Sequence, residues 1–219
     1  MNLIVLTDLH GRTTGPEHLD ADLKDADLII LCGDITHFGS GVEAERIIGL
    51  INRYRNQILA VSGNCDLSEV NNKLRALEID LEGSIRSVGG ISFTGLNGSL
   101  PCPVRTPNER TEIEFQLLLD NLNNPPYNYS SEWIFVTHQP PYGTICDRLP
   151  DGRHVGSRVI RKYLEQTQPL ICFTGHIHEG VGVDRIGRTT VVNPGPFRGG
   201  NYARVKLGFS STPEVELIT

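Results

Sequence analysis

The sequence lacks any apolar run that approaches the roughly 18 residues needed to span a bilayer. Residues 1–5 carry no basic leader and no cleavage site, and they run directly into an apolar segment that we expect to be a strand. These absences argue against a membrane-spanning or exported protein. We therefore expect a cytoplasmic protein with no membrane partner.

Paired cysteines are missing as well. The five cysteines are odd in number and widely separated, and no two of them form a CxxC pair. Neither a disulfide framework nor a structural zinc knuckle is therefore expected. Cys32 and Cys172 lie inside apolar runs, where we expect them to act as small buried hydrophobic residues.

A surplus of basic residues is the third absence. The formal net charge is -6, and no segment interleaves basic with aromatic residues. Nonspecific binding to nucleic acid or to an anionic membrane is therefore not favoured. An anionic small molecule is not excluded, because bound divalent cations would outweigh the average charge locally.

The chain instead contains short apolar runs that alternate with amphipathic segments, which suits one α/β domain over residues 1–219. The apolar runs predict strands over 3–7, 27–32, 58–61, 133–137, 170–174, 182–186, 189–192, 202–207 and 214–218, and a hairpin over 84–95. Helical spacing predicts helices over 40–56, 67–77, about 109–122 and 157–166. The front is thus βαβ and the tail a β meander, which fits one mixed sheet or two stacked sheets flanked by helices.

Local signals add detail to this outline. Ser40 and Glu43 are spaced as a capping box at the start of one helix, and Asp66 is placed to be the N-cap of the next. The prolines and glycines of residues 96–108 predict a long loop of the kind that often carries function. Residues 139–156 predict a surface excursion over a site.

Five polar clusters follow predicted strands: Asp8-Leu9-His10, Gly33-Asp34, Gly63-Asn64-Cys65-Asp66, Thr137-His138 and Gly175-His176-Ile177-His178. Taken singly, each has a plain alternative as a helix cap, a β-turn or a half-buried polar group. Taken together they fall at the carboxyl ends of strands, where open α/β sheets gather their ligand sites. Imidazoles, carboxylates and an amide in such a place indicate metal binding.

In order and spacing, these clusters resemble the motifs of the calcineurin-like metallophosphoesterase superfamily over most of the chain. The segments 137–144, 175–179 and 193–195 are similar to small single-domain members, including relatives of class III cyclic-nucleotide phosphodiesterases. The resemblance implies a four-layer αββα sandwich with two mixed sheets. It also implies that one metal is held by Asp8, His10, Asp34 and His178, and a second by Asp34, Asn64, His138 and His176.

A pair of divalent ions bridged by Asp34 can share a hydroxide that attacks phosphorus in line, so no protein nucleophile is needed. We therefore expect an enzyme that hydrolyses a small phosphodiester or phosphomonoester, with a nucleotide-like substrate. A shell of His, Asp and Asn suits manganese, iron, cobalt, nickel or zinc better than magnesium or calcium. Manganese or iron is favoured.

One position departs from the family pattern. Many members have histidine after the asparagine, where it binds phosphate and protonates the leaving oxygen, whereas this chain has Cys65. A thiol is a weak hydrogen-bond donor, so Cys65 is a doubtful general acid. His37 and His154 are the histidines that could replace it, although an exposed loop residue is the commoner role for each.

Phosphate contacts are expected from Asn64, His154 and Arg12, with Arg148 and Arg153 as further candidates because their forked guanidinium groups suit a phosphate. Two alternatives to this enzyme stay open. One is a noncatalytic scaffold, although such proteins usually lose ligands and all seven are present. The other is a nuclease, which the acidic composition disfavours. The sequence leaves open the natural substrate, mono- or diester preference, the metal and the oligomeric state.

Overall fold

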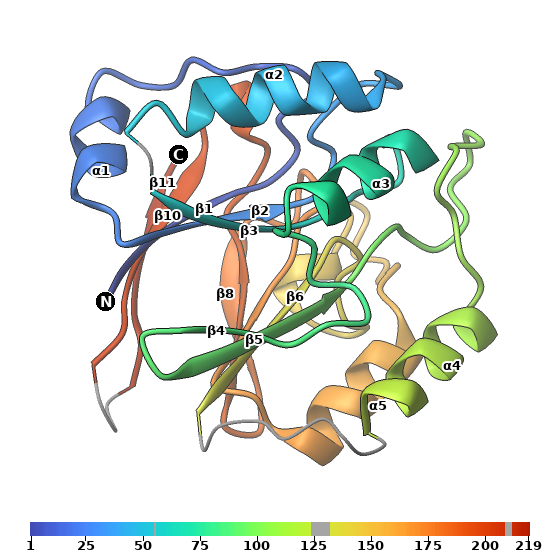
Figure 1. Ribbon diagram of the computed structural model, residues 1–219. Helices are drawn as coiled ribbons and strands as arrows, with labels where there is room; N and C mark the ends of the chain where they lie inside the picture. Colours follow the sequence, from blue (N-terminus) through green and yellow to red (C-terminus); the bar gives the residue numbers. More distant parts are fainter. Residues whose placement is uncertain (55, 124–131, 209–211) are drawn as a thin grey trace.

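The computed structural model describes residues 1–54, 56–123, 132–208 and 212–219, so residue 55 of the helix predicted over 40–56 lies outside it. Across these residues the chain forms two mixed sheets and five α-helices (Figure 1). None of the helices in these ranges is both long enough and apolar enough to cross a membrane.

The first sheet has the strand order β11-β10-β1-β2-β3. Strands β1, β2 and β3 are parallel, β10 is antiparallel to β1, and β11 is antiparallel to β10. The strands are β1 (Asn2–Leu6), β2 (Leu28–Cys32), β3 (Gln57–Val61), β10 (Tyr202–Lys206) and β11 (Glu214–Ile218).

The second sheet has the order β4-β5-β6-β7-β9-β8, with β5, β6, β7 and β9 parallel and the two edge strands antiparallel. Its strands are β4 (Arg86–Val88), β5 (Ile91–Leu96), β6 (Trp133–Thr137), β7 (Ile171–Phe173), β8 (Gly182–Ile186) and β9 (Thr189–Asn193). Gly89 and Gly90, both with positive φ, form the two-residue turn of the β4–β5 hairpin, as predicted.

Helices cover the outer faces of both sheets (Figure 1). They are α1 (Leu19–Asp25), α2 (Gly41–Ile51), α3 (Ser68–Ala76), α4 (Glu112–Asn123) and α5 (Arg158–Thr167), and two short 3-10 turns lie at Ile145–Asp147 and Phe197–Gly199. The first three pack on the first sheet, and α4 and α5 pack on the second. The four layers of the predicted αββα sandwich are therefore confirmed.

Three apolar cores lie between these four layers. Alternate residues of one strand enter different cores: Ile4 and Leu6 of β1 face the helices, while Leu3 and Val5 face the second sheet. The central strands are apolar throughout because both of their faces are buried. This explains why short, fully apolar runs located them in the sequence.

Two expectations need correction, and one helix was missed. The tail is not one meander, because β8 and β9 belong to the second sheet and β10 and β11 to the first. Helix α1 was not predicted, since it buries only Leu19 and Leu23 and has no side-chain N-cap bond. Asp66 is not the N-cap of α3, because Leu67 occupies that position and the Asp66 carboxylate accepts the backbone N–H of Thr36 instead.

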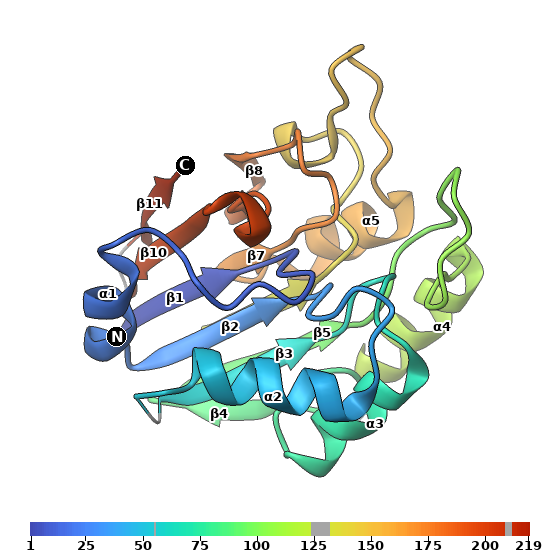
Figure 2. The same cartoon turned by 90° about the horizontal axis from the view of Figure 1, so that it is seen from above.

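Helix termini and faces otherwise follow simple chemistry. The Ser40 hydroxyl accepts the N–H of Glu43 at 3.3 Å, which forms the Ser40 half of the predicted capping box. In α4 the buried face is Phe115, Leu119 and Leu122, while Ile113 is exposed. The parallel strands of the first sheet all end toward the same side, where the loops that follow them gather (Figure 2).

Candidate metal centre

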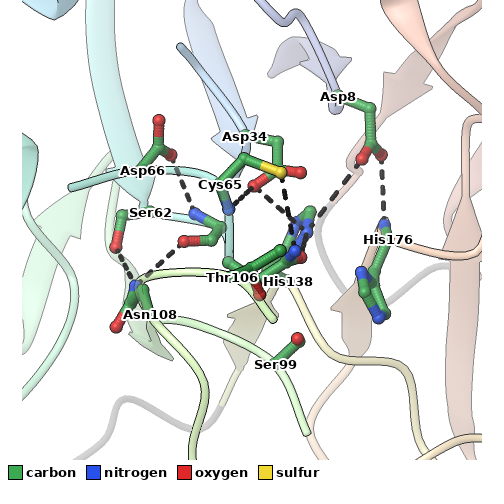
Figure 3. Close-up of polar contacts among 12 residues, drawn as sticks. Asp8, Asp34, Ser62, Cys65, Asp66, Ser99, Thr106, Asn108, His138 and His176 are labelled. Atoms are coloured by element: carbon green, nitrogen blue, oxygen red, sulfur yellow. Dashed lines mark hydrogen bonds and ion pairs between the residues drawn. The ribbon is translucent and has the colours of Figure 1, made fainter. Parts of the chain in front are cut away.

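Five loops bring the predicted ligands together at this end of the sandwich. Three loops follow β1, β2 and β3 of the first sheet, and two follow β6 and β7 of the second. Asp8, Asp34, Cys65, His138 and His176, all labelled in Figure 3, therefore lie in loops that directly follow buried strands.

Asp8 is 1% exposed and is held from both sheets. Its Oδ2 accepts the Thr7 hydroxyl at 2.8 Å and the backbone N–H of His176 at 3.1 Å. Its Oδ1 lies 3.2 Å from Nε2 of His178. The carboxylate is thus oriented so that one oxygen remains directed at an imidazole.

Asp34 lies between two imidazoles. Its Oδ1 accepts the N–H of Cys65 at 2.8 Å and lies 3.5 Å from Nε2 of His138, while its Oδ2 lies 3.6 Å from Nε2 of His10. The preceding Gly33 has φ +95°, and a Cβ there would collide with the His138 ring. Only glycine therefore allows the β2 loop to bring this carboxylate against His138.

His138 is fully buried and its ring is oriented by main-chain chemistry. Its Nδ1 lies 2.8 Å from the carbonyl oxygen of Cys32, to which Nδ1–H donates. Its Nε2 consequently faces the centre, 3.0 Å from Oδ1 of Asn64. An imidazole held through Nδ1 in this way presents Nε2 as a ligand atom.

The pKa shifts around the two buried carboxylates, Asp8 and Asp34, reflect their stabilisation by nearby positive charge. Burial alone would lower the pKa of His138, but the charge of Asp34 outweighs it and raises that pKa to about 9. Burial raises the pKa of Asp8, yet its hydrogen bond with His178 and the charge of His138 hold it below the usual range. The hydrogen bond with Asp8 in turn raises the pKa of His178. Protonated imidazoles therefore balance the carboxylates when no other cation does.

His10 supplies the sharpest test of whether cations fit. Its Nε2 is buried and has no hydrogen-bond partner, although Asp8 Oδ1 is 3.9 Å away and Asp34 Oδ2 is 3.6 Å away. Burial lowers the pKa of His10, which favours the neutral ring that can act as a metal ligand. An unpartnered imidazole nitrogen aimed between two carboxylates fits a metal ion.

Among the described residues, three sets of side chains have potential ligand atoms within 4.8 Å of one another: His10 with His37 and Cys65, Asp8 with His10 and His178, and Asp8 with Asp34 and His138. The resemblance implied Asp34 as the shared ligand, whereas Asp8 is the residue common to the two groups that contain a carboxylate. The two oxygens of Asp34 nevertheless face His138 and His10 separately, so both carboxylates lie between the two groups.

His176 occupies a different part of the centre. Its ring centroid is 5.1 Å from that of His138, and burial together with the charge of His138 lowers its pKa to about 4. Its Nε2 faces Sγ of Cys102 at 3.6 Å. Cys102 comes from the predicted functional loop over 96–108, so this loop does reach the site, although the sequence did not single out the cysteine.

Left-handed backbone is concentrated in these loops. Asp8, His10, Asp34 and His176 all have positive φ, between 45° and 68°. Non-glycine residues rarely adopt this conformation, and they cluster at functional sites when surrounding structure enforces it. The motif spacing predicted that these residues are special, but it did not predict their backbone strain.

Two residues have supporting roles that the sequence did not predict. Asp66 accepts the N–H groups of Ile35 (3.1 Å), Thr36 (2.8 Å) and Gly63 (2.9 Å), and so ties the β2 and β3 loops together. Asn108 donates to Ser62 Oγ at 3.1 Å and to the Gly63 carbonyl at 2.9 Å (Figure 3). The available signal was that both residues are polar and lie within predicted site loops.

The residues predicted to contact substrate have different surroundings. Asn64 lies in the centre beside His138. The exposed Arg12 donates from Nε to the Thr14 carbonyl at 2.7 Å and also donates to the Arg198 carbonyl. Arg198 was missed; its backbone N–H donates to the Asp8 carbonyl at 3.1 Å.

The side chain of His154 makes its contacts within the loop over residues 139–156. Its Nδ1 lies 2.7 Å from Oδ1 of the fully buried Asp147, and its ring is 5.7 Å from that of Tyr142. Asp147 also accepts the N–H groups of Gly143, Thr144 and Gly156, so it organises this loop. A phosphate contact by His154 stays a prediction.

Cys65 is buried beside the centre, where its sulfur lies 3.5 Å from Nδ2 of Asn64. Burial and the neighbouring Asp34 charge raise the pKa of the thiol well above its usual value. The group therefore remains a neutral thiol. It cannot supply the positive charge that a histidine would place there.

Two packed mixed sheets whose strand ends gather buried carboxylates and imidazoles define an α/β protein with a candidate metal-dependent site. The comparison with protein families then fixes the class. The chain belongs to the calcineurin-like phosphoesterase superfamily, whose domain model matches residues 1–204.

Individual relatives support this assignment. The uncharacterized protein MJ1162 of Methanocaldococcus jannaschii is 39% identical over 201 residues, which cover 90% of this chain and 88% of that protein. The crystal structure of TT1561 of Thermus thermophilus has a TM-score of 0.73 at 17% identity, covering 98% of this chain and 97% of that one. A structure described as a novel archaeal phosphodiesterase has a TM-score of 0.54 at 14% identity, covering 100% and 99%. The structural likenesses confirm the predicted fold.

Proposed function

We propose that this chain is a dimetal phosphoesterase that hydrolyses a small phosphodiester or phosphomonoester, with phosphodiesters preferred and a nucleotide-like substrate. The observation that carries the proposal is the buried, unpartnered Nε2 of His10, which points between the carboxylates of Asp8 and Asp34. A purely structural histidine would have a hydrogen-bond partner at such a position.

The residues suit two ions. Asp8, His10, Asp34 and His178 would hold one, and Asp34, Asn64, His138 and His176 would hold the other. A mixed nitrogen and oxygen donor set favours manganese or iron, with zinc, cobalt or nickel as alternatives. When bound, such ions would supply an activated water and would neutralise charge on the phosphoryl group.

The chain itself contributes orientation. The Cys32 carbonyl fixes the His138 ring through Nδ1, and the Thr7 hydroxyl and the His176 N–H fix Asp8. These contacts set the ligand atoms before substrate arrives, so little reorganisation is needed during the reaction. We expect Asn64 and the exposed guanidinium groups of Arg12 and Arg198 to contact phosphate oxygens.

Protonation of the leaving oxygen is the weak step of this site. Cys65 stands where many relatives have histidine, and burial holds its thiol neutral. We therefore expect slow hydrolysis of esters with poor leaving groups and faster hydrolysis of activated diesters such as nitrophenyl esters. A flat dependence of rate on leaving-group acidity would contradict this expectation.

The test begins with elemental analysis of gently purified protein, for which we expect about two transition-metal ions per chain. A panel of mono-, di- and cyclic nucleotides with added manganese then identifies the reaction. Asp151→Asn is the matched control, because Asp151 is an exposed carboxylate in the 139–156 loop. Protein that stays metal-free with manganese supplied, or that hydrolyses no ester on the panel, would overturn the proposal.

The competing functions predict other results. A scaffold would bind a protein partner equally well with and without metal. A nuclease would cleave polynucleotides faster than mononucleotide esters, which the net charge of -6 disfavours. The expected cytoplasmic location and the single domain over residues 1–219 stay predictions.

A further inference from the structure

Phe38 is an exposed aromatic residue beside the metal centre. It lies four residues after Asp34, in the loop between β2 and α2, and 45% of it is exposed. A lone exposed hydrophobic residue is ordinary on a protein surface, so exposure alone does not indicate a binding site. The backbone and the neighbouring rings distinguish Phe38 from the other exposed apolar residues.

Phe38 shares the unusual backbone of the candidate ligands. Seven non-glycine residues among those that the structure describes have positive φ. Four are candidate metal ligands, and Glu78 and Gln168 lie at the ends of helices, where this conformation is common. Phe38, with φ +59°, is the remaining one. An aromatic residue rarely adopts this conformation unless its surroundings enforce it, as they do at functional sites.

The surroundings enforce it through hydrogen bonds. The N–H of Phe38 donates to the Cys65 carbonyl at 3.1 Å, and the N–H of Gly39 donates to the Thr36 hydroxyl at 3.2 Å. Thr36 is itself bound to the buried Asp66 through its N–H and its hydroxyl, both at 2.8 Å. The loop that carries the ring is therefore tied to the scaffold, so a ligand that stacks on it has little chain entropy to overcome.

Two ring contacts join Phe38 to the centre. The Phe38 ring centroid is 4.6 Å from that of His37, and the His37 centroid is 5.3 Å from that of His10. The Nδ1 atoms of His37 and His10 are 3.3 Å apart. The His37 and Phe38 rings are tilted by 50° and the His10 and His37 rings by 75°, so the three rings form a series of tilted and edge contacts that leads from the candidate centre to the exposed phenyl ring.

We propose that Phe38, with His37 beside it, is the stacking platform for a planar ring that the substrate carries next to its phosphoryl group, namely a nucleobase. This inference rests on the proposed function, because the phosphoryl group must sit at Asp8 and Asp34 for its substituent to reach the platform. Aromatic side chains stack on any base because every base presents a π-face. The platform therefore selects nucleotides over sugar phosphates without selecting one base.

The size of the platform favours a base over a protein partner. A stable protein interface buries about 800 Å² on each partner. The platform consists of one phenyl ring and one imidazole, and it adjoins the candidate catalytic centre rather than a broad apolar face. A single flat ring held next to a phosphate is the ligand that matches both features.

The experiment compares adenosine 5′-monophosphate with ribose 5-phosphate, which has the same phosphate and sugar but no base. Calorimetry with the manganese-loaded protein gives the two dissociation constants, and kcat/KM values replace them for a ligand that is hydrolysed. We expect the nucleotide to be favoured about 5- to 150-fold, the range that stacking of one base produces. Phe38→Ala should bring the ratio close to one and leave ribose 5-phosphate unchanged.

Two further variants separate stacking from folding. Phe38→Gly removes the ring but suits the left-handed backbone, so it should lose the base preference while keeping its stability. Tyr54→Ala removes an aromatic residue that is 41% exposed beyond the end of α2, and it should keep the preference. A ratio that survives in both Phe38 variants overturns the platform alone. Failure of both ligands to bind the loaded wild type overturns the platform together with the proposed function.

Discussion

Asp34 and Asp66 are two buried carboxylates in neighbouring loops, and they differ in what surrounds their oxygens. Both follow a glycine-containing turn after a strand of the first sheet, and both are at most 2% exposed. Asp66 accepts three backbone N–H groups and one hydroxyl, all within 3.1 Å. Asp34 accepts one backbone N–H, from Cys65, and otherwise faces imidazole nitrogens at 3.5 and 3.6 Å.

The contrast separates a scaffold carboxylate from a candidate ligand. A buried carboxylate surrounded by fixed N–H donors is already satisfied, whereas one that faces imidazoles can share a cation with them. Sequence position alone does not distinguish the roles of Asp34 and Asp66, since each ends a similar polar cluster. The number of hydrogen-bond donors around each carboxylate distinguishes them.

The largest effect should come from Asp34→Asn. Removing this charge takes away the carboxylate between His10 and His138, so we expect metal content below two ions per chain. The value of kcat/KM should fall at least about a hundredfold, because metal ions supply several kcal/mol of charge stabilisation. Metal analysis and phosphoester kinetics check both effects. Full metal content and near-normal turnover in this variant would show that Asp34 is not a metal ligand.

Asp66→Asn should act on folding instead. An amide NH₂ group replaces one acceptor oxygen, so buried donors on Ile35, Thr36 or Gly63 lose their partner. We expect the free energy of unfolding of the metal-free protein to fall by about 2 to 4 kcal/mol. Urea denaturation measures it, with the exposed Asp151→Asn expected to stay within about 0.5 kcal/mol of wild type. Unchanged stability would show that Asp66 is not the tie between the two loops.

Much of the fold was predictable because burial on two faces leaves a clear sequence signal. The strands of the first sheet read as apolar runs, and the Gly89-Gly90 pair located the hairpin. Helix α1 was not predictable, because two buried leucines in seven residues give too little periodicity. The split of the tail between two sheets depends on the pairing of β10 with β1, which no local pattern encodes.

The candidate ligands were predictable for a different reason. Asp8, His10 and the other polar residues at strand ends form an ordered set of motifs that resembles one family. Their supporting contacts were not predictable, since the Asp66 hydrogen bonds and the approach of Cys102 to His176 join segments far apart in sequence. Asp66 was misassigned as a helix cap because its local position suits that role equally well.

A proton and a metal ion compete for Nε2 of His138, which faces Asp34. Burial lowers the pKa of this ring, but Asp34 raises it to about 9, so Nε2 is protonated at neutral pH without metal. A metal ion at Nε2 must displace that proton. Manganese affinity should therefore rise about tenfold per pH unit for each displaced proton, and this rise should flatten above about pH 9.

The raised pKa of His138 also makes the stability of the metal-free protein depend on pH, and this stability should fall with rising pH whereas manganese affinity should rise. Because the folded-state pKa of about 9 exceeds the usual His value of 6.5, protonated His138 stabilises the metal-free protein fully below pH 6.5. That stability should be lost as the pH rises through 9. Calorimetry and urea denaturation at pH 7, 8 and 9 test the pair of trends. Affinity that is independent of pH would show that no proton leaves His138.

The smallest expected effect comes from Cys65→His, a substitution in the loop after β3 that contacts Asp34. The Cys65 backbone N–H already donates to Asp34, so the substitution keeps that contact while it exchanges a neutral thiol for a titratable ring. If protonation of the leaving oxygen limits turnover, hydrolysis of alkyl esters should rise about tenfold, a fraction of the usual contribution of a general acid. Nitrophenyl esters need no acid, so their rate should stay nearly constant. Equal changes for both ester classes would mean that the new side chain alters metal or substrate binding instead of proton transfer.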